Sequence, residues 1–330
     1  MVEAGTGIGK SFAYLAGAID QAVRQQGKVV ISTYTINLQE QLIGKDIPFL
    51  QQLLPEPFTA RLAKGRTHYL CKRRLEFAVK RQMSLFEDDG TALMRITEWA
   101  RQTVDGSLSD LPFIPPATVW QAVQSEHGNC RGRKCPYFSK CFYGRMRRQL
   151  ETADIIVANH ALLFSDLVLK QSGVGVLPDY QTVILDEAHN IEHVAEDHFG
   201  IRMSQFSLGY LLDRLYEPRK RKGILAFRSD TEARSLVQSC RQAMQVFFAQ
   251  VQAWYAHAGE AHNGRCEAEF VQDNLSAPIK SLRLSLSKLA KHTKDEDEQF
   301  EILQYAERLA AMETDVKDFL FQRKEGCVYW

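Results

Sequence analysis

Residues 3–11 read Glu3-Ala4-Gly5-Thr6-Gly7-Ile8-Gly9-Lys10-Ser11, and a helical pattern follows them directly. The stretch is close to the Walker A pattern, whose glycines let backbone N–H groups point at phosphate oxygens at a helix N-terminus. The pattern predicts a loop formed by Gly5, Thr6, Gly7 and Gly9. In it Lys10 reaches the β- and γ-phosphates of a nucleotide and Ser11 binds Mg²⁺. Ala4 replaces the first glycine of the pattern, so a plain glycine-rich turn is the alternative interpretation.

Apolar, β-branched runs alternate with helical patterns after this loop. Helices are expected over residues 10–26 and 35–54, and strands over residues 29–32, 155–158 and 183–185. Strands that are apolar throughout, without alternation, are typical of parallel sheets covered on both faces. The sequence therefore predicts an α/β fold with a parallel sheet. Only two or three residues precede the loop, so the strand that should lead into it is expected to be missing from the chain.

The run that ends at residue 185 leads into Asp186-Glu187-Ala188-His189. An apolar strand ending in two carboxylates is the Walker B arrangement, in which Asp186 holds Mg²⁺ and Glu187 orients and deprotonates the attacking water. The alternative is an acidic helix N-terminus that favours the helix dipole. The phosphate loop upstream favours the Walker B interpretation. The chain carries no guanine-recognition signature, which favours ATP over GTP.

Positive charge is concentrated in two segments of the chain. Residues 61–81 hold eight Lys and Arg against one acid, and residues 130–148 hold seven against none. Together they carry +14, whereas all 330 residues carry +1. Aromatic residues are interleaved with these cations, a combination that predicts binding to a single-stranded polyanion.

Four of the seven cysteines lie in or between these basic segments. Cys71 stands alone, and Cys130, Cys135 and Cys141 follow with four and five residues between them. Zinc sites usually show paired Cys-x-x-Cys knuckles, and none occurs here. The looser spacing favours an iron–sulfur cluster, with zinc and unrelated buried thiols as the alternatives. Cys240, Cys266 and Cys327 lie far from one another in the sequence and are expected to bind no metal.

Residues 203–324 are expected to be almost wholly helical. Apolar residues recur there every three or four positions, which predicts packing faces: Val237, Cys240, Met244, Phe247, Val251 and Trp254; Leu275, Ile279, Leu282, Leu286 and Leu289; Phe300, Leu303, Leu309, Val316 and Leu320.

The composition is that of an ordinary globular chain, with 45% hydrophobic and 25% charged residues. No run of about 18 apolar residues suggests a membrane span. The N-terminus does not read as a signal peptide, so a reducing, cytoplasmic compartment is expected.

A phosphate loop, a four-cysteine segment and a DEAH sequence, in this order, resemble the XPD/DinG family of iron–sulfur superfamily 2 DNA helicases, and most of all its bacterial DinG/YoaA type. The matching strings span residues 3–11, 64–71, 129–142, 153–160 and 186–189. The resemblance implies a 4Fe-4S cluster held by Cys71, Cys130, Cys135 and Cys141. It also implies that His189 links the nucleotide to the nucleic-acid site.

The resemblance implies a RecA-like lobe over residues 1–62 and 150–202, interrupted by a 4Fe-4S cluster domain over residues 63–149. A helical Arch domain would follow over residues 203–326. The second RecA-like lobe is expected to be absent, because the chain stops before that lobe's motifs. The chain alone is accordingly expected to show little or no ATPase or unwinding activity.

The function that the resemblance implies is ATP-dependent 5′-to-3′ unwinding of DNA in repair or replication, by a monomer that binds single-stranded and forked DNA. Strand contacts are expected from Lys64, Arg66 and Tyr69, and from Ser32 and Thr33 as helicase motif Ia. A non-catalytic, redox-sensitive protein that binds single-stranded DNA is the alternative from another class. RNA as the substrate also stays open, because no residue pattern here detects a 2′-hydroxyl.

Overall fold

The computed structural model describes residues 2–5, 8–85, 90–171, 173–200, 202–219, 222–226, 228 and 230–330. The chain divides into two compact units, Met1–Gly200 and Ile201–Trp330. Residues 63–149 belong to the first compact unit together with the sheet. The finer division of this unit into a lobe and a cluster domain stays a prediction.

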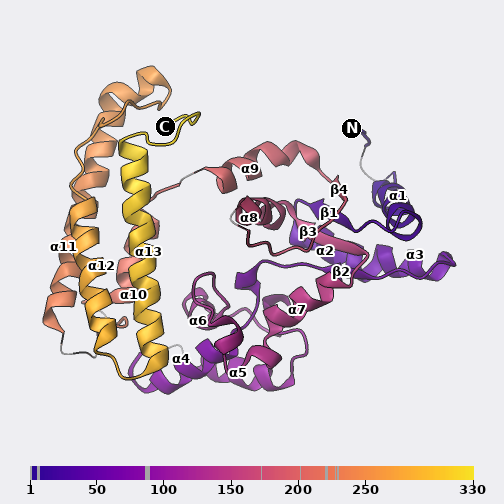
Figure 1. The fold of residues 1–330 in the computed structure, drawn as a ribbon, viewed down its shortest axis with the longest axis horizontal. Helices are drawn as coiled ribbons and strands as arrows, with labels where there is room; N and C mark the ends of the chain where they lie inside the picture. Colours follow the sequence, from indigo (N-terminus) through magenta and orange to yellow (C-terminus); the bar gives the residue numbers. More distant parts are fainter. Residues whose placement is uncertain are drawn as a thin grey trace. The chain divides into compact units, whose positions relative to one another are not determined.

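A four-stranded parallel sheet forms the centre of the first unit (Figure 1), with the strand order β2-β3-β1-β4. Its strands are β1 Val29–Thr33, β2 Ala60–Leu62, β3 Ile155–Asn159 and β4 Thr182–Leu185. The α/β class, the parallel sheet and three predicted strands are thereby confirmed. The sequence did not predict β2, because three residues with Arg61 at the centre do not form an apolar run.

Both faces of the central strands β1 and β3 are buried. Val29 and Ile31 of β1 pack with Leu15 and Ile19 of helix α1 (Lys10–Arg24) on one face. On the other face Val30 joins a core that includes helix α8 (His160–Gln171) and residues of the 63–149 segment. Since successive strand residues point to opposite faces, both sets must be apolar, which explains why β1 shows no alternation.

Helices surround this sheet, and one predicted helix is interrupted. The predicted helix 35–54 is in fact α2 Ile36–Gln41, a π-helical turn Leu42–Asp46 and α3 Ile47–Leu53. Pro48 has no N–H to donate to the preceding turn, so the regular α-helical bonding is broken there, and the proline is tolerated in the first turn of α3. The other helices are α1 Lys10–Arg24, α4 Lys72–Leu85, α5 Gly90–Gln102, α6 Ala117–Val123, α7 Phe142–Glu151, α8 His160–Gln171 and α9 Ile191–Phe199.

Lys28, directly before β1, fastens the C-terminus of α7 to the sheet. Its Nζ donates to the carbonyl oxygens of Leu150 at 3.1 Å and Glu151 at 3.2 Å, and also to that of Ala153. The last carbonyl groups of a helix have no partner within the helix, and a lysine there also complements the helix dipole. One side chain therefore joins the basic, cysteine-bearing segment to the central sheet.

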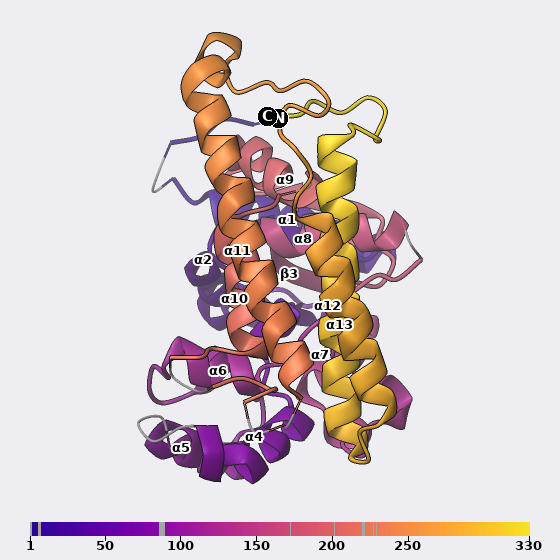
Figure 2. The same cartoon turned by 90° about the vertical axis from the view of Figure 1, so that its left-hand side faces the viewer.

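The second unit is helical. It contains α10 Gln205–Leu215, α11 Thr231–Trp254, α12 Ser276–Lys291 and α13 Glu296–Leu320. Figure 2 shows α11, α12 and α13 as long helices running beside one another. Asp230 and Asp295 accept hydrogen bonds from backbone N–H groups in the first turns of α11 and α13, as N-caps do. The prediction of an almost wholly helical segment is too broad, because residues 263–275 are irregular.

The predicted packing faces form most of the core of the second unit. Val237 of α11, Leu282 of α12 and Leu309 of α13 are fully buried in one cluster. Leu303 was predicted to lie on the packing face but is 37% exposed, and Ile302, Tyr305 and Ala306 are buried beside it. At this part of α13 the buried stripe is therefore offset by one residue from the stripe that the sequence predicted. None of the described helices has the length and apolar content to cross a membrane.

Replacing Leu282 by Ala should lower the free energy of unfolding of the second unit by about 2–5 kcal/mol, because a fully buried side chain is lost and a cavity is left. Leu284→Ala is the matched control on the same helix, since Leu284 is 51% exposed. It should change stability by less than about 0.5 kcal/mol. Urea unfolding followed by circular dichroism measures both, and equal losses would contradict the packing described.

Candidate functional site

The carboxyl ends of β1, β3 and β4 lie together at one edge of the sheet. In the parallel register Ser32 of β1 pairs with Ala158 of β3 and with Leu185 of β4. His160 and Asp186 therefore follow the two strands that flank β1, at the same edge. In parallel α/β sheets this edge is where ligands bind.

Lys10 and Glu187 meet at this edge, although 177 positions separate them in the sequence. Lys10 Nζ lies 3.1 Å from Glu187 Oε1, and each side chain is 32% exposed. Gly9, before α1, adopts the left-handed conformation with φ 84°, which glycine tolerates without strain. Glu187 has φ 54°, a conformation that costs a non-glycine residue roughly 1–2 kcal/mol. The structure thus joins the lysine of the predicted phosphate loop to a carboxylate of the DEAH sequence.

Asp186 is held by three other residues. Its N–H donates to the carbonyl oxygen of Ser32 at 2.8 Å, and its carbonyl oxygen lies 2.9 Å from His160 Nε2. The hydroxyl of Tyr14 donates to its Oδ2 at 3.3 Å. Burial, reinforced by the Asp186 carboxylate, raises the pKa of Tyr14, so this hydroxyl stays protonated.

His160 is fully buried and has a partner for each ring nitrogen. Nδ1 lies 2.7 Å from the Ser32 hydroxyl, while Nε2 faces the Asp186 carbonyl oxygen, which can only accept. Nε2 therefore carries the hydrogen, and Nδ1 accepts from Ser32 in the neutral ring. Burial lowers the pKa of His160, in keeping with that neutral form. Sequence reasoning assigned no role to this residue. The signal it passed over is a polar residue placed directly after a buried strand.

The remaining predicted nucleotide residues are placed as follows. Ser11 lies in the first turn of α1, and Gly5 and Gly9 of the predicted loop precede this helix, while Thr6 and Gly7 lie outside the described residues. His189 is 72% exposed, with its Nδ1 3.5 Å from Glu187 Oε2. Its predicted role as a link to nucleic acid stays a prediction.

Four of the five predicted strand contacts are enclosed by protein. Ser32 and Thr33 are fully buried, Tyr69 is 2% exposed and Lys64 is 9% exposed. The Lys64 ammonium contacts the hydroxyls of Ser107 and Ser109 and lies 3.8 Å from Glu40.

Arg66 is half-buried, and its guanidinium carbon lies 4.3 Å from the centroid of the Tyr143 ring. Of the five, it alone offers a partly accessible side chain in the described conformation. Direct contact of the other four with a strand would need a rearrangement.

Two of the four cysteines lie at the starts of helices, and the other two lie between them in the chain. Cys71 directly precedes α4, and Cys141 is the N-cap of α7, with the Gly144 N–H 3.4 Å from its sulfur. Cys130 and Cys135 lie between them in the chain, on a segment that α4 holds through Arg73 and Glu76. These two residues bond to Asn129 and Tyr137 respectively.

All four thiols are free. Burial raises the pKa of Cys71 and the neighbouring Cys141 adds to this, while Arg73 and Arg74 oppose it. Among the described side chains, no three His, Cys, Asp or Glu residues lie close enough together to hold a metal ion. The donor types nevertheless suit a cluster chemically, because thiolates are the usual ligands of iron–sulfur clusters and nearby cations such as Arg73 and Arg74 would offset their charge.

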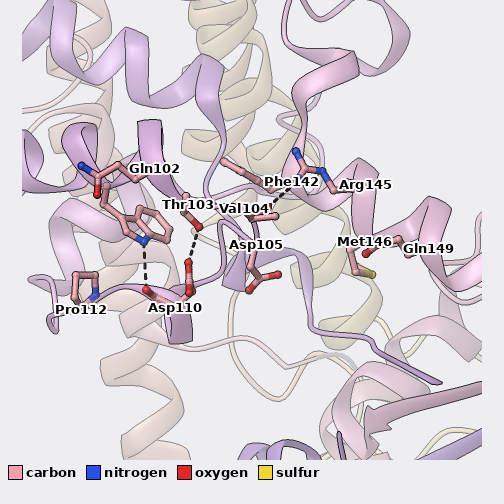
Figure 3. A pocket seen from close by; sticks show the side chains of 11 residues that line it. Gln102, Thr103, Val104, Asp105, Asp110, Pro112, Phe142, Arg145, Met146 and Gln149 are labelled. Atoms are coloured by element: carbon pink, nitrogen blue, oxygen red, sulfur yellow. Dashed lines mark hydrogen bonds between the residues drawn. The ribbon is translucent and has the colours of Figure 1, made fainter. Parts of the chain in front are cut away.

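A separate open pocket of about 500 Å³ lies in the 63–149 part of the first unit, with α7 on one side. Figure 3 shows Asp110 bonded to Thr103 and, through its backbone oxygen, to an indole nitrogen, while Arg145 reaches the Val104 carbonyl oxygen. Its main polar groups are thus paired within the protein, and no predicted site residue lines it.

Comparisons with known proteins agree on one family. Residues 119–208 match the family described as DEAD_2. The chain is 34% identical to "ATP-dependent DNA helicase YoaA" of Escherichia coli over 242 residues, which are 73% of this chain and 36% of the relative. It is 38% identical to "ATP-dependent DNA helicase DinG" of Photobacterium profundum over 226 residues, 64% of this chain and 32% of the relative.

A third relative is similar over almost the whole chain. The "3'-5' exonuclease DinG" of Bacillus subtilis is 28% identical over 330 residues, which cover 99% of this chain and 34% of that protein. The chain thus spans about a third of the length of the curated relatives it matches.

Replacing His160 by Ala should lower the free energy of unfolding by about 2–4 kcal/mol, because it leaves a cavity and two buried polar groups without their partner. His160→Gln, which can still donate and accept, should lose less. His257→Ala, at an exposed histidine, is the control and should stay within about 0.5 kcal/mol of the parent. Urea unfolding measures all three, and a loss in His160→Ala no larger than the control's would contradict the buried bridge.

Proposed function

We propose that this chain, which belongs to the DinG-type helicase family, serves ATP-dependent 5′-to-3′ unwinding of DNA. The observation that carries the proposal is the ion pair between Lys10 and Glu187, beside Asp186, at the carboxyl edge of the sheet. A phosphate-loop lysine and the two carboxylates of a DEAH sequence are the groups that nucleotide hydrolysis requires there. Because the chain spans about a third of its relatives' length, their activity enters as part of the proposal.

The nucleotide would bind at the start of α1. Lys10 would leave Glu187 for the β- and γ-phosphates, with Gly5, Thr6, Gly7 and Gly9 as the surrounding loop. Ser11 and Asp186 would hold Mg²⁺ through hard oxygen donors of the kind this ion prefers, and the ion would neutralise charge on the phosphates. Glu187, freed from Lys10, would accept a proton from water. His189, which contacts Glu187, would link this site to the nucleic acid.

The basic segments would bind single-stranded or forked DNA. Lys134 and Lys140 are exposed, and Phe138 between them is 43% exposed. Cations that follow phosphates beside an aromatic face suit sequence-tolerant binding of a single strand. Arg66 would contact the strand directly. The buried side chains of Lys64, Tyr69, Ser32 and Thr33 would support the contacting surface and would reach the strand only after a rearrangement.

The cysteine segment would hold a 4Fe-4S cluster through Cys71, Cys130, Cys135 and Cys141. The support is that α4 binds both ends of the segment that carries the second and third of these residues. In this proposal residues 1–62 and 150–202 form the RecA-like lobe, residues 63–149 the cluster domain and residues 203–326 the Arch domain. Action in the cytoplasm, as a monomer in DNA repair or replication, completes the proposal.

Lys10→Ala should weaken binding of a fluorescent ATP analogue at least about tenfold, because a charge-assisted contact with phosphate is lost. Fluorescence anisotropy of the analogue measures the affinity. Lys45→Ala, at an exposed lysine of the same unit, is the control and should bind like the parent. Equal affinity in the parent and in Lys10→Ala would overturn the proposed nucleotide site.

Anaerobically purified protein should show a broad absorbance band near roughly 400 nm and about four irons per chain. Replacing any one of Cys71, Cys130, Cys135 and Cys141 by Ser should lower the iron content and the band. Cys327→Ser, at an exposed cysteine remote in sequence from the four, is the control and should keep both. A colourless parent protein containing one zinc would contradict the cluster assignment.

A further inference from the structure

Tyr14 lies one helical turn after Ser11 on α1. Side chains on a helix lean toward its N-terminus, so the Tyr14 hydroxyl reaches back toward the phosphate loop. There it donates to Asp186 Oδ2 at 3.3 Å. The phenol oxygen therefore touches the carboxylate that the proposed function assigns to Mg²⁺.

The ring of Tyr14 is fixed by packing. It is half-buried against the apolar core that α1 forms with the sheet, a core that includes Leu15 and Ile31. Phenylalanine would fill the same space, and burying a hydroxyl is unfavourable unless it is hydrogen-bonded. Packing alone thus explains the ring and leaves the hydroxyl unexplained.

We infer that Tyr14 is a positioning residue for the Mg²⁺ site, whose hydroxyl holds Asp186 Oδ2 and leaves Oδ1 free for the ion. This inference rests on the proposed function. Residues that hydrogen-bond a metal ligand orient it, and their loss typically weakens metal binding by about 10–100-fold. Asp186 is then fixed at its backbone by Ser32 and His160 and at its carboxylate by Tyr14.

The test is Tyr14→Phe, which removes one oxygen and keeps the ring. Binding of a fluorescent ATP analogue is measured by anisotropy in EDTA and during titration with Mg²⁺, so that the readout does not depend on turnover. In Tyr14→Phe the Mg²⁺ concentration at half-effect should rise about tenfold, while the affinity in EDTA stays within about twofold of the parent. Tyr34→Phe, at a tyrosine that is 44% exposed, should match the parent in both conditions.

An unchanged Mg²⁺ midpoint in Tyr14→Phe would overturn the positioning role and leave the proposed nucleotide site intact. An equal loss of affinity in EDTA and in Mg²⁺ would also overturn it, because the hydroxyl would then act on the nucleotide or the fold. A parent protein that binds no nucleotide with or without Mg²⁺ would remove the proposed function itself, and the role of Tyr14 with it.

Discussion

Asp186 stands where three strands of the parallel sheet end, and the candidate site depends on how it is held there. Its backbone is bound on one side by Ser32, at the end of β1, and on the other by His160, directly after β3. This buried bridge sets where the chain turns after β4 and hence where Glu187 meets Lys10. A parallel sheet makes the convergence possible, because its carboxyl ends share one edge.

The sequence predicted those elements and site residues that a local pattern marks. It did not predict features that arise only when distant parts of the chain pack together. The apolar runs predicted three strands, and the glycines and the DEAH sequence predicted the groups that meet at Lys10 and Glu187. The short strand β2 has no such run, and Pro48 interrupts a helix that the apolar pattern continued through. The hydrogen bonds that His160 makes to Ser32 and Asp186 could not be predicted from the sequence, because residues 32, 160 and 186 meet only after the sheet forms.

Burial also changes what can be expected of the basic region. A charge count treats every lysine and arginine alike, yet Lys64 is enclosed by hydroxyls and a carboxylate, while Lys134 and Lys140 are exposed. Local sequence cannot separate these cases, since both kinds lie among glycine, cysteine and aromatic residues. Lys28 then joins α7, whose N-cap is Cys141, to the strand that leads to Ser32. The end of the cysteine segment and the candidate nucleotide site are thus connected through β1.

The most direct measurement is a crystal structure of the protein with Mg²⁺ and a non-hydrolysable ATP analogue. We predict phosphate oxygens at the N-terminus of α1, within hydrogen-bonding distance of Lys10 Nζ. We also predict that the Lys10 ammonium has moved away from Glu187 Oε1, from which it lies 3.1 Å in the present structure. A nucleotide bound elsewhere, with the Lys10–Glu187 pair still closed, would contradict the assignment of this edge of the sheet as the nucleotide site.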